Sequence, residues 1–479
     1  MTARQVCVVG AGPGGLAAAE GALAAGARVT LLDTAPRAGG QYHRGSAGDH
    51  RAAARSSSAY GRRLRRVLDH PRCTWLPETS VWALEHPHPG GPEGPPLVHV
   101  LSGPADGTAR ERRVLRPDAL VLAPGAHDRV LPFPGWDLPG VFTAGAAQAL
   151  AKGERLAVGD DVLVAGTGPF LLPVAATLLE TGARVTAVLE ANTPGTLVRG
   201  WAGRPYELPA LAAKSRELAR YAAVLARHRV PFRTARAVIE ARGDGRVEEA
   251  VTARLRPDWS VVPGSERVVA ADALCVGHGF TPQLELPVAA GCALRGEPWD
   301  AYVVVDGDQH TSIPGVYAAG EITGIAGAPA ARAEGALAGW AAGGGAPDAP
   351  RLRALRRSRD QGRAFARRLA SAHPVGAEWY AWLRGETVIC RCEETTYEAL
   401  RRSTSAPGGT DPRVTKLETR AGLGPCQARV CGPTTALLRA VGGRSAGAPT
   451  ATPHNRPLTQ PIRLGELAAP ATEHQEDRE

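Results

Sequence analysis

Aromatic residues and long apolar runs are both scarce in this sequence. Phe, Trp and Tyr make up 5% of the 479 residues while glycine occurs 57 times, so small aliphatic side chains must fill the cores. No run of about 18 uncharged apolar residues occurs, which argues against a membrane-spanning helix. The first residues lack the apolar stretch and the cleavage site of a signal peptide. These absences predict a cytoplasmic protein without a transmembrane segment.

The sequence also lacks the features of a nucleic-acid-binding protein and of a serine hydrolase. The net charge of +9 comes from arginines spread along the whole chain, without a lysine-rich tail or an aromatic-basic repeat. We therefore expect no nucleic-acid partner, and acidic cofactors or an acidic partner surface account for the excess. A G-x-S-x-G nucleophile is also absent, and His127, His278 and His310 stand in turn contexts without a metal-spaced partner. We interpret these histidines as structural or surface residues, and the catalytic residues stay unknown.

An internal repeat organises the first two thirds of the chain. The segment 6–33 recurs as 162–190, and a constant offset separates the corresponding glycines, Gly10 and Gly166 among them. Each copy contains an apolar strand, a glycine turn, an Ala/Leu-rich helix and a second strand rich in β-branched residues. Two such βαβ units predict an α/β protein with two Rossmann-like dinucleotide-binding domains.

The first glycine turn has the complete pattern of a dinucleotide site. Gly10, Gly12 and Gly15 form G-x-G-x-x-G within GAGPGG, which also contains Gly14, and Asp33 ends the following strand. These glycines permit a tight turn, the approach of a pyrophosphate and close packing of helix on strand. The amino terminus of the helix then faces the phosphates, and Asp33 can accept hydrogen bonds from a ribose hydroxyl.

Later segments favour FAD over NAD at this first site. Gly40 and Gln41 follow Asp33 in a second flexible turn, which suits a backbone approach toward the flavin. The segment SIPGVYAAGEITG resembles the strand-turn-helix near the end of flavoprotein reductases with two dinucleotide domains. That resemblance places Gly320 and Glu321 beside the ribityl chain, although the reductases usually have Asp where Glu321 stands. It also includes Gly125, which follows Pro here and commonly Thr in those reductases.

The second unit departs from the dinucleotide pattern. Gly166 and Gly168 are present, but Leu171 replaces the third glycine and would hold helix and strand farther apart. Glu190 ends the second strand, where a carboxylate suits the 2′-hydroxyl of NAD and repels the 2′-phosphate of NADP. Two interpretations stay open, a working nicotinamide site and a structural or adenine-nucleotide-only domain.

Four of the eight cysteines cluster near the carboxyl end. Cys390 and Cys392 form C-x-C, and Cys426 and Cys431 form C-x4-C. Four thiolates are what a 2Fe–2S cluster needs, two for each iron. Zinc ribbons and redox disulfides more often use C-x2-C pairs, so the spacing favours iron–sulfur over zinc or bare thiols.

The order of these motifs predicts the domain organisation, in which the chain leaves the first domain, builds the second and returns. A Gly/Ala/Pro-rich linker precedes a stretch at 351–369 whose apolar residues have helical spacing and whose arginines occupy the other face. The tail is expected to be extended, or disordered at its acidic end. The predicted parts are the first part of the FAD domain (1–150), the second Rossmann-like domain (151–274), the return segment of the FAD domain (275–345), a linker and helix (346–385), a 2Fe–2S module (386–441) and the tail (442–479).

Taken together, the motifs carry a family resemblance. GAGPGG, APGAHDRVLPFPGWDLPGVFTAGAAQAL, AAGEITGIAGA, CRCEE and TRAGLGPCQARVCGP occur in this order. They resemble the larger flavoprotein subunit of heteromeric amine and amino-acid dehydrogenases, a group with opine oxidase, hydrogen cyanide synthase and dye-linked proline or hydroxyproline dehydrogenases. The cysteine segment is similar to the bacterioferritin-associated ferredoxin domain. The resemblance implies a glutathione-reductase-like fold with this module attached at its carboxyl end.

The same resemblance implies a division of labour. A partner flavoprotein of the amino-acid-oxidase type would oxidise the amine or amino acid, often with a small ferredoxin-like subunit present, and this chain would relay electrons. The complex could lie peripherally at a membrane. Two alternatives stay open, an NADH-dependent reductase of a ferredoxin or dye, and a non-catalytic scaffold with vestigial cofactor sites. Leu171 argues against the reductase, and the intact first glycine motif and the four cysteines argue against the scaffold.

Overall fold

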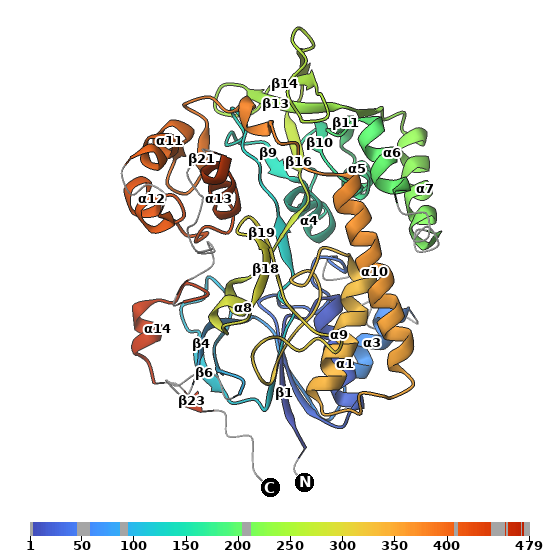
Figure 1. Cartoon of the computed structure of the whole chain (residues 1–479), viewed down its shortest axis with the longest axis vertical. Helices are drawn as coiled ribbons and strands as arrows, with labels where there is room; N and C mark the ends of the chain where they lie inside the picture. Colours follow the sequence, from blue (N-terminus) through green and yellow to red (C-terminus); the bar gives the residue numbers. More distant parts are fainter. Residues whose placement is uncertain are drawn as a thin grey trace.

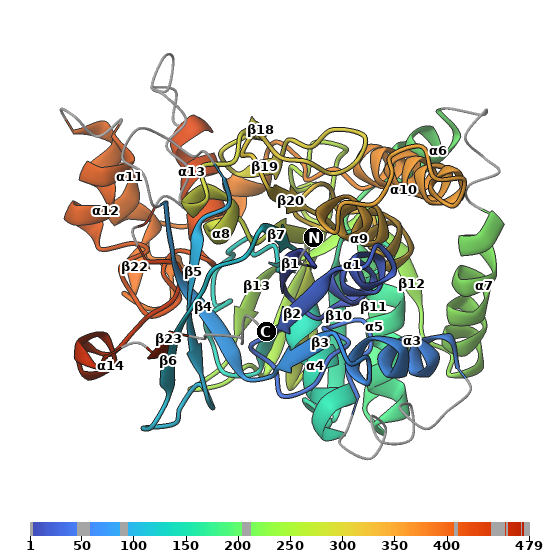
Figure 2. The same ribbon diagram turned by 90° about the horizontal axis from the view of Figure 1, so that it is seen from below.

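The computed structural model contains two α/β bodies stacked along the long axis of the molecule, with a small helical module beside the second (Figure 1). The first and last described strands, β1 (Gln5–Val9) and β23 (Thr472–Glu473), lie toward the outer end of the first body. In the two views of Figures 1 and 2, the module and the strands from β4 (Thr79–Glu85) to β6 (Glu111–Leu115) lie on the side away from α7 (Ala212–Arg227) and α10 (Leu352–Ala372). The described residues are 3–45, 58–86, 94–203, 212–406, 411–441, 456, 458–470 and 472–473.

The first body is built on a five-stranded sheet in the order β3-β2-β1-β7-β20, in which every neighbouring pair is parallel. The strands are β1 (Gln5–Val9), β2 (Arg28–Leu32), β3 (Cys73–Leu76), β7 (Ala119–Leu122) and β20 (Val316–Ala318). The helices are α1 (Pro13–Ala24), α3 (Ala59–Leu68) and α9 (Ala328–Ala342). The central strands are nearly all buried, because α1, α3 and α9 cover one face of the sheet and the sheet that begins with β4 (Thr79–Glu85) and β5 (Leu97–Ser102) packs against the other.

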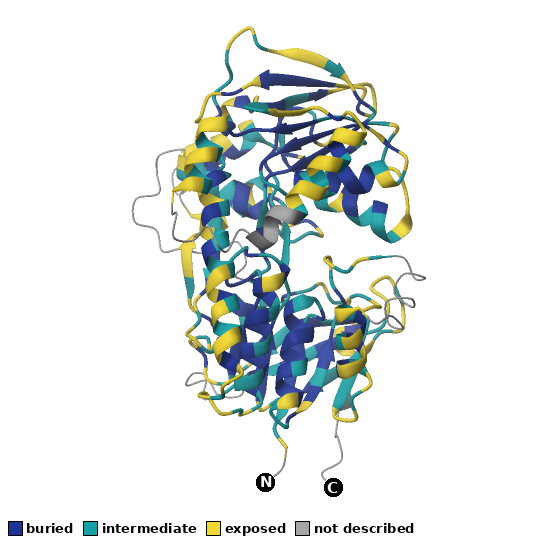
Figure 3. Ribbon diagram, turned by 90° about the vertical axis from the view of Figure 1, so that its right-hand side faces the viewer, coloured by how far each residue is buried: buried dark blue, intermediate teal, exposed yellow. Residues whose placement is uncertain are grey.

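The second body repeats this topology, with the parallel order β12-β11-β10-β16-β9. The two glycine units therefore occupy equivalent places, as the internal repeat predicts. The strands are β9 (Val141–Thr143), β10 (Asp161–Gly166), β11 (Arg184–Glu190), β12 (Phe232–Thr234) and β16 (Ala273–Gly277). The helices are α4 (Ala144–Glu154), α5 (Leu171–Glu180), α6 (Pro194–Ala202) and α7 (Ala212–Arg227). Figure 3 shows buried residues concentrated in the strands and inner helix faces of both bodies.

The two sheets fill their fifth position differently. In the first body β20 follows β7 along the chain, whereas in the second body β9 precedes β10. The second sheet thus takes up a strand before residue 151 and a strand that extends past residue 274. A three-residue strand such as β9 has too few residues for a recognisable alternation, so only its pairing with β16 reveals its place.

Smaller sheets connect the bodies. The strands β8 (Ala126–Asp128) and β17 (Phe280–Pro282) pair where the chain leaves and re-enters the first body. A four-stranded sheet contains β4 (Thr79–Glu85), β5 (Leu97–Ser102), β6 (Glu111–Leu115) and β23 (Thr472–Glu473). A three-stranded sheet contains β13 (Arg236–Arg242), β14 (Glu249–Arg254) and β15 (Arg267–Ala270). A two-stranded sheet pairs β18 (Leu294–Glu297) with β19 (Asp300–Val303). The short helix α8 (Glu285–Ala289) follows β17.

One long helix, α10 (Leu352–Ala372), joins the two bodies along one flank (Figure 1). It confirms the helix predicted from the apolar spacing at 351–369. A Cβ on Gly362 would lie 2.3 Å from Ala330 Cβ in α9, and one on Gly200 would lie 2.2 Å from Ala372 Cα. Two glycines therefore let α10 pack closely against a helix of each body.

The carboxyl-terminal module contains β21 (Val388–Cys390), β22 (Thr395–Thr396), α11 (Tyr397–Ser405), α12 (Pro412–Thr419) and α13 (Gly432–Val441). Trp136 anchors it, because its ring is buried, its Nε1 donates to Val388 O at 2.5 Å and the Arg391 guanidinium lies 4.1 Å from the ring centroid. Thr434 Oγ1 adds a hydrogen bond to Val130 O at 2.6 Å. The module is thus docked onto the loop that follows β8.

The tail differs from the extended form expected for it. Residues 464–468 form the helix α14 (Leu464–Ala468), and a bidentate ion pair of Arg110 with Glu466, at 2.7 Å for both bonds, holds this helix against the first body. The two residues of this ion pair are 356 positions apart in the sequence, so no local sequence pattern predicts the pair. The acidic end, 474–479, lies outside the described residues.

Packing of α1 on α9 gives a stability prediction. A Cβ on Gly339 would lie 1.8 Å from Ala18 O, a backbone atom that cannot move aside cheaply. Alanine gains about 1 kcal/mol of helix propensity over glycine, whereas overpacking costs about 3 kcal/mol, so Gly339→Ala should destabilise the fold by about 2 kcal/mol. A lower midpoint of denaturant unfolding measures this. The control Gly307→Ala, where no described atom lies within 4 Å of the added carbon, should change little. A Gly339→Ala midpoint at or above that of wild type would contradict the close packing.

Candidate cofactor sites

The first glycine turn, between β1 and α1, leaves no room for side chains. Gly10 has a φ of +99°, and a Cβ there would lie 2.3 Å from Ala123 O. A Cβ on Gly15 would lie 1.6 Å from Gly10 O, and one on Gly40 would lie 2.9 Å from Gly12 Cα. The turn therefore presents bare backbone at the amino terminus of α1, as close approach of a pyrophosphate requires.

Asp33 supports this turn from the end of β2. Its Oδ2 accepts a hydrogen bond from Ala11 N at 2.6 Å and its Oδ1 accepts one from Ala35 N at 2.8 Å. Burial raises the pKa of Asp33, and the same two hydrogen bonds act in the opposite direction. Because a carboxylate oxygen has two lone pairs, each can still accept a bond from a ribose hydroxyl.

Three of the predicted flavin-site glycines meet at one edge of the first sheet. Gly10, Gly125 and Gly320 follow β1, β7 and β20, whose registers place Val9 and Ala318 on either side of Leu122. The carboxyl ends of parallel strands are where open α/β sheets bind ligands. Gly14 packs α1 against Ala331, and Gln41 lies exposed beyond Gly40.

Glu321 lies at this edge but caps the start of α9. Its Oε1 accepts a hydrogen bond from Gly327 N at 3.0 Å. Glu334, which sequence reasoning missed, is the carboxylate beneath the turn. It is buried and accepts bonds from Gly320 N at 3.0 Å and from Thr323 Oγ1 at 2.6 Å. A lone Glu in the middle of an Ala/Gly-rich helix was the available signal.

The second glycine turn keeps the bare backbone but begins its helix later. A Cβ on Gly166 would lie 1.7 Å from Gly277 O, whereas no described atom lies within 4 Å of one on Gly168. The helix α5 begins at Leu171, two residues after Pro169, which corresponds to the first residue of α1. Leu171 itself is buried between α5 and β16, so the third glycine of the first unit is replaced by a core residue.

The carboxylate of Glu190 already accepts several hydrogen bonds from other groups of the protein. It is buried and accepts hydrogen bonds from Thr167 Oγ1 at 2.9 Å, Gly168 N at 2.8 Å and Asn192 N at 2.9 Å. Its Oε2 also lies 3.1 Å from Nδ1 of His373, at the end of α10. Burial would raise the pKa of Glu190, but the bond and charge of His373 and the backbone N–H groups lower it overall. A role of Glu190 toward a ribose would thus be added to this structural role.

His278 lies fully buried just after β16, beside a cavity of about 20 Å³ between the second body and the module. Burial and, to a smaller extent, the charge of Arg129 lower the pKa of His278 to about 4, while Glu190 opposes this. The buried position agrees with the structural role predicted for this residue. His310 bonds to Asp306 at the surface, with its backbone N 3.0 Å from Asp306 Oδ1.

The neutral His278 should make stability fall in mild acid. Below about pH 6.5 the unfolded chain binds a proton at this residue, whereas the folded chain does so only near pH 4. The unfolded state is therefore favoured progressively from pH 6.5 down to pH 4, by about 3 kcal/mol in all. Urea unfolding at several pH values should show a weaker dependence for His278→Gln than for wild type. Parallel pH dependences in this window would contradict the assignment.

The four clustered cysteines come together in the module. Hydrogen bonds join Cys390 to Cys431, Cys431 to Cys426, and Cys426 to Cys392. The bond from Cys431 lowers the pKa of Cys390 to about 6 and that of Cys426 to about 5, with backbone N–H groups adding to the effect and burial opposing it. Bonds to these two sulfurs raise the pKa of Cys431, and burial raises that of Cys392. These pKa shifts favour the thiolate form at Cys390 and Cys426 over Cys392 and Cys431.

The donor set fits an iron–sulfur cluster in its chemistry. In the part of the chain that the structure describes, no three or more His, Cys, Asp or Glu side chains have ready-made metal-ligand geometry. The site nevertheless offers four sulfurs in two pairs, with backbone N–H groups of Gly422 and Glu393 directed at Cys390. A Cβ on Gly424 would lie 2.2 Å from Cys392 Cβ, so glycine is needed where this turn passes the sulfur. Thiolates with backbone hydrogen bonds are the ligands that such clusters use.

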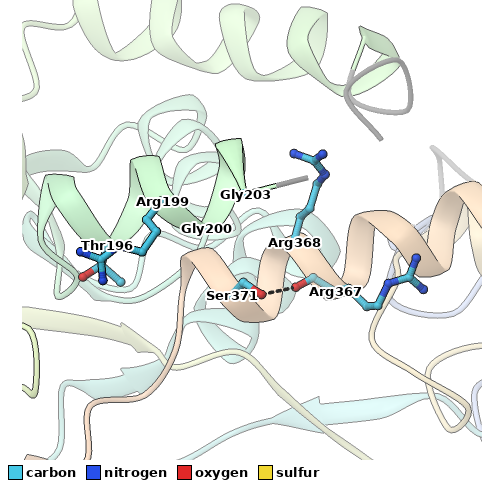
Figure 4. A pocket seen from close by; sticks show the side chains of 7 residues that line it. All are labelled: Thr196, Arg199, Gly200, Gly203, Arg367, Arg368 and Ser371. Atoms are coloured by element: carbon cyan, nitrogen blue, oxygen red, sulfur yellow. Dashed lines mark hydrogen bonds between the residues drawn. The ribbon is translucent and has the colours of Figure 1, made fainter. Parts of the chain in front are cut away.

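A separate cavity of about 280 Å³ lies between α6 and α10, lined by Arg199, Arg367 and Arg368 among others. Figure 4 shows the three arginine side chains pointing in different directions. Arg368 is buried and donates to Trp201 O. Because the charges do not converge, we assign this cavity no ligand.

Within the described residues, no helix has both the length and the apolar character needed to cross a bilayer.

Comparisons with known proteins agree with this architecture. Residues 4–335 match the family described as pyridine nucleotide-disulphide oxidoreductase. The chain is 32% identical to a subunit of the opine oxidase of Rhizobium meliloti, over 97% of this chain and 87% of the relative. It is 31% identical to the HcnB subunit of the hydrogen cyanide synthase of Pseudomonas protegens, over 91% and 92% of the two chains.

One solved structure supports the fold over nearly the whole length. The L-proline dehydrogenase from P. horikoshii superposes with a TM-score of 0.64, at 18% identity, over 98% of this chain and 80% of that one. These findings confirm the resemblance inferred from the motifs. The chain belongs to the pyridine nucleotide-disulphide oxidoreductase family and, within it, to the group that contains these opine oxidase and hydrogen cyanide synthase subunits.

Proposed function

We propose that this chain binds FAD in its first body and a 2Fe–2S cluster in its carboxyl-terminal module, and relays electrons within a heteromeric oxidoreductase. The observation that carries the proposal is the meeting of Cys390, Cys392, Cys426 and Cys431 in a module that Trp136 docks onto the loop after β8. Family membership supports FAD, and the four thiols support the cluster. The domain boundaries predicted from the sequence remain part of this proposal, with β9 added to the second body.

The residues proposed for FAD act mainly through their backbone. The N–H groups at the start of α1 would bind the pyrophosphate, and Asp33 would accept from the ribose while holding the turn through Ala11 N. FAD supplies the capacity to take up and pass on electrons. The residues proposed to contact FAD are Gly10, Gly12, Gly14, Gly15, Asp33, Gly40, Gln41, Gly125, Gly320 and Glu321.

Substrate oxidation is assigned to another chain. The relatives are named as single subunits of an opine oxidase and of a hydrogen cyanide synthase, so in each case the whole enzyme contains more than one kind of chain. We infer that an amino-acid-oxidase-like flavoprotein partner oxidises a CH–NH or CH–NH2 donor, such as an opine, glycine, proline or hydroxyproline. A small ferredoxin-like protein would join them, in the cytoplasm or peripherally at a membrane through the complex.

The cofactor content tests this proposal. Protein purified anaerobically after growth with iron should contain roughly one FAD and two irons per chain. Flavin released on denaturation and elemental analysis of iron and zinc give these values. Zinc in place of iron would overturn the cluster, and chain without FAD would overturn the first site.

The second glycine unit leads to a prediction about nicotinamide. Because Leu171 fills the helix–strand contact and Glu190 places a buried negative charge at the turn, NADPH should not reduce the flavin and NADH should do so slowly, if at all. Anaerobic stopped-flow mixing with each nucleotide measures the rates. Rapid, saturable reduction by NADPH would contradict this interpretation of Glu190, and rapid reduction by NADH would favour the alternative of a self-sufficient reductase.

A further inference from the structure

A buried group of charged residues lies directly beside the cysteine cluster. Arg429 stands in the turn between Cys426 and Cys431, and its Nε lies 3.0 Å from Oε1 of Glu285. Arg456, from the carboxyl-terminal segment, lies 3.6 Å from the same oxygen. The side chains of Arg429, Glu285 and Arg456 are 14%, 5% and 9% exposed, so bulk water screens these charges little.

Gln427 joins the two arginines next to the sulfurs. Its Oε1 accepts from Arg456 Nη1 at 2.9 Å and from Arg429 Nη1 at 3.1 Å. Burial lowers the pKa of Arg456, and its electrostatic interactions with Glu285 and with the two cysteines Cys426 and Cys431 oppose this. Two guanidinium groups therefore face one carboxylate, and one positive charge remains in excess beside the sulfurs.

The carboxyl-terminal segment holds Arg456 in this place. Arg429 Nη2 donates to Thr459 O at 2.5 Å, and Thr459 donates through Oγ1 to Val81 O at 2.8 Å and through its N to Trp82 O at 2.8 Å. Thr459 therefore links the cysteine turn to β4 of the first body. Glu285 reaches the same point from α8, which also belongs to the first body.

We propose that Glu285, Arg429 and Arg456 set the reduction potential of the cluster held by the four cysteines, with the carboxyl-terminal segment supplying one of the charges. This inference rests on the proposed function. Reduction adds one negative charge to the cluster, so a nearby buried positive charge favours the reduced form and a buried carboxylate disfavours it. Arg456 and Glu285 should therefore shift the reduction potential of the cluster in opposite directions, the arginine upward and the glutamate downward. A purely structural ion network predicts no such opposition.

The test is a redox titration of the full-length holoprotein, followed by the visible absorbance and the electron paramagnetic resonance signal of the reduced cluster. Arg456→Gln should lower the ratio of reduced to oxidised cluster at a fixed potential about tenfold, and Glu285→Gln should raise it about tenfold. A tenfold change corresponds to 59 mV for a one-electron couple. Arg456→Lys keeps the charge and should stay within about twofold of wild type.

A matched exposed pair serves as the control. Arg420 pairs with Glu393 at 2.7 Å beside Cys392, but its side chain is 66% exposed. Arg420→Gln should therefore shift the ratio less than twofold, because solvent screens that charge. If Glu285→Gln loses iron, the two Arg456 variants still test the proposal. A changed ratio of reduced to oxidised cluster in Arg456→Gln, without a change in Arg456→Lys, supports it.

The outcomes separate this inference from the proposed function. Full iron content with unchanged potentials in Arg456→Gln and Glu285→Gln, or shifts of the same sign in both, would overturn the charge network alone. Equal shifts in Arg456→Gln and Arg456→Lys would overturn it too, because they would point to packing. A wild-type chain without a cluster would overturn the proposed function, and this inference with it.

Discussion

Cys426→Ser is expected to reduce the iron content from about two per chain to nearly zero while leaving the FAD content unchanged. Cys426 contacts both Cys431 and Cys392, so its sulfur links the two cysteine pairs. A serine oxygen is a poor replacement for a soft thiolate ligand. The module is a separate unit that docks on the loop after β8 and pairs with Glu285 of α8, so the glycine turn after β1 should be unaffected.

Cys73→Ser is the matched control for this prediction. Cys73 is half-buried in β3, where burial raises the pKa of its thiol to about 11, and it lies far along the chain from the module. This variant should keep both iron and FAD. Iron retained in Cys426→Ser, or lost equally in both variants, would contradict the assignment of the four cysteines.

The second large effect concerns the isolated chain, which should not dehydrogenate any amino acid, N-methyl amino acid or opine. The predicted site residues comprise glycines, carboxylates that hold turns, and cysteines, and none is a recognisable base for an organic substrate. Asp33 accepts a hydrogen bond from Ala11 N and Glu190 accepts one from Gly168 N, so both carboxylates stabilise the glycine turns. Co-expression with an amino-acid-oxidase-like partner should raise dye reduction from background by orders of magnitude.

Anaerobic dye reduction across a panel of these substrates measures this effect. The matched comparison is the complex that contains the Cys390→Ser variant, in which electron transfer should slow while assembly persists, as size-exclusion chromatography would show. Robust turnover by the single chain would show a self-contained active site, and the division of labour would be wrong.

Much of the fold could be predicted from the repeat. The glycine turns and the apolar runs around Gly10 and Gly166 identify two βαβ units, and the two sheets have equivalent strands in four of their five positions. The apolar spacing at 351–369 likewise predicts α10, because helical periodicity is a local property. The four cysteines were recognisable because their spacing is itself the signal.

What the sequence could not provide is contact between distant segments. His373 reaches Glu190 from the far end of α10, and Trp136 donates to Val388 in the strand that contains Cys390. The pairs of Glu285 with Arg429 and Arg456 join three separate segments. Such contacts depend on tertiary packing and leave no periodic trace, so a single sequence gives no reason to link these residues.

The structural role that Glu190 has in addition to the expected one has the same origin. A carboxylate at the end of β11 predicts a ribose partner from the motif, but Thr167, Asn192 and His373 also converge on it. These partners make Glu190 a support of the glycine turn whether or not a nucleotide binds. A functional motif and a buried structural carboxylate look alike in one sequence.

The most direct test of the electron relay is anaerobic addition of the amine or amino-acid substrate to the assembled complex, with the cluster observed by electron paramagnetic resonance. The account predicts that the signal of a reduced 2Fe–2S cluster appears in the wild-type complex and neither in the isolated chain nor in the complex with Cys426→Ser, which should also lose dye reduction. Full dye reduction by a complex without its cluster would show that electrons do not pass through this chain's cluster, and would contradict the account.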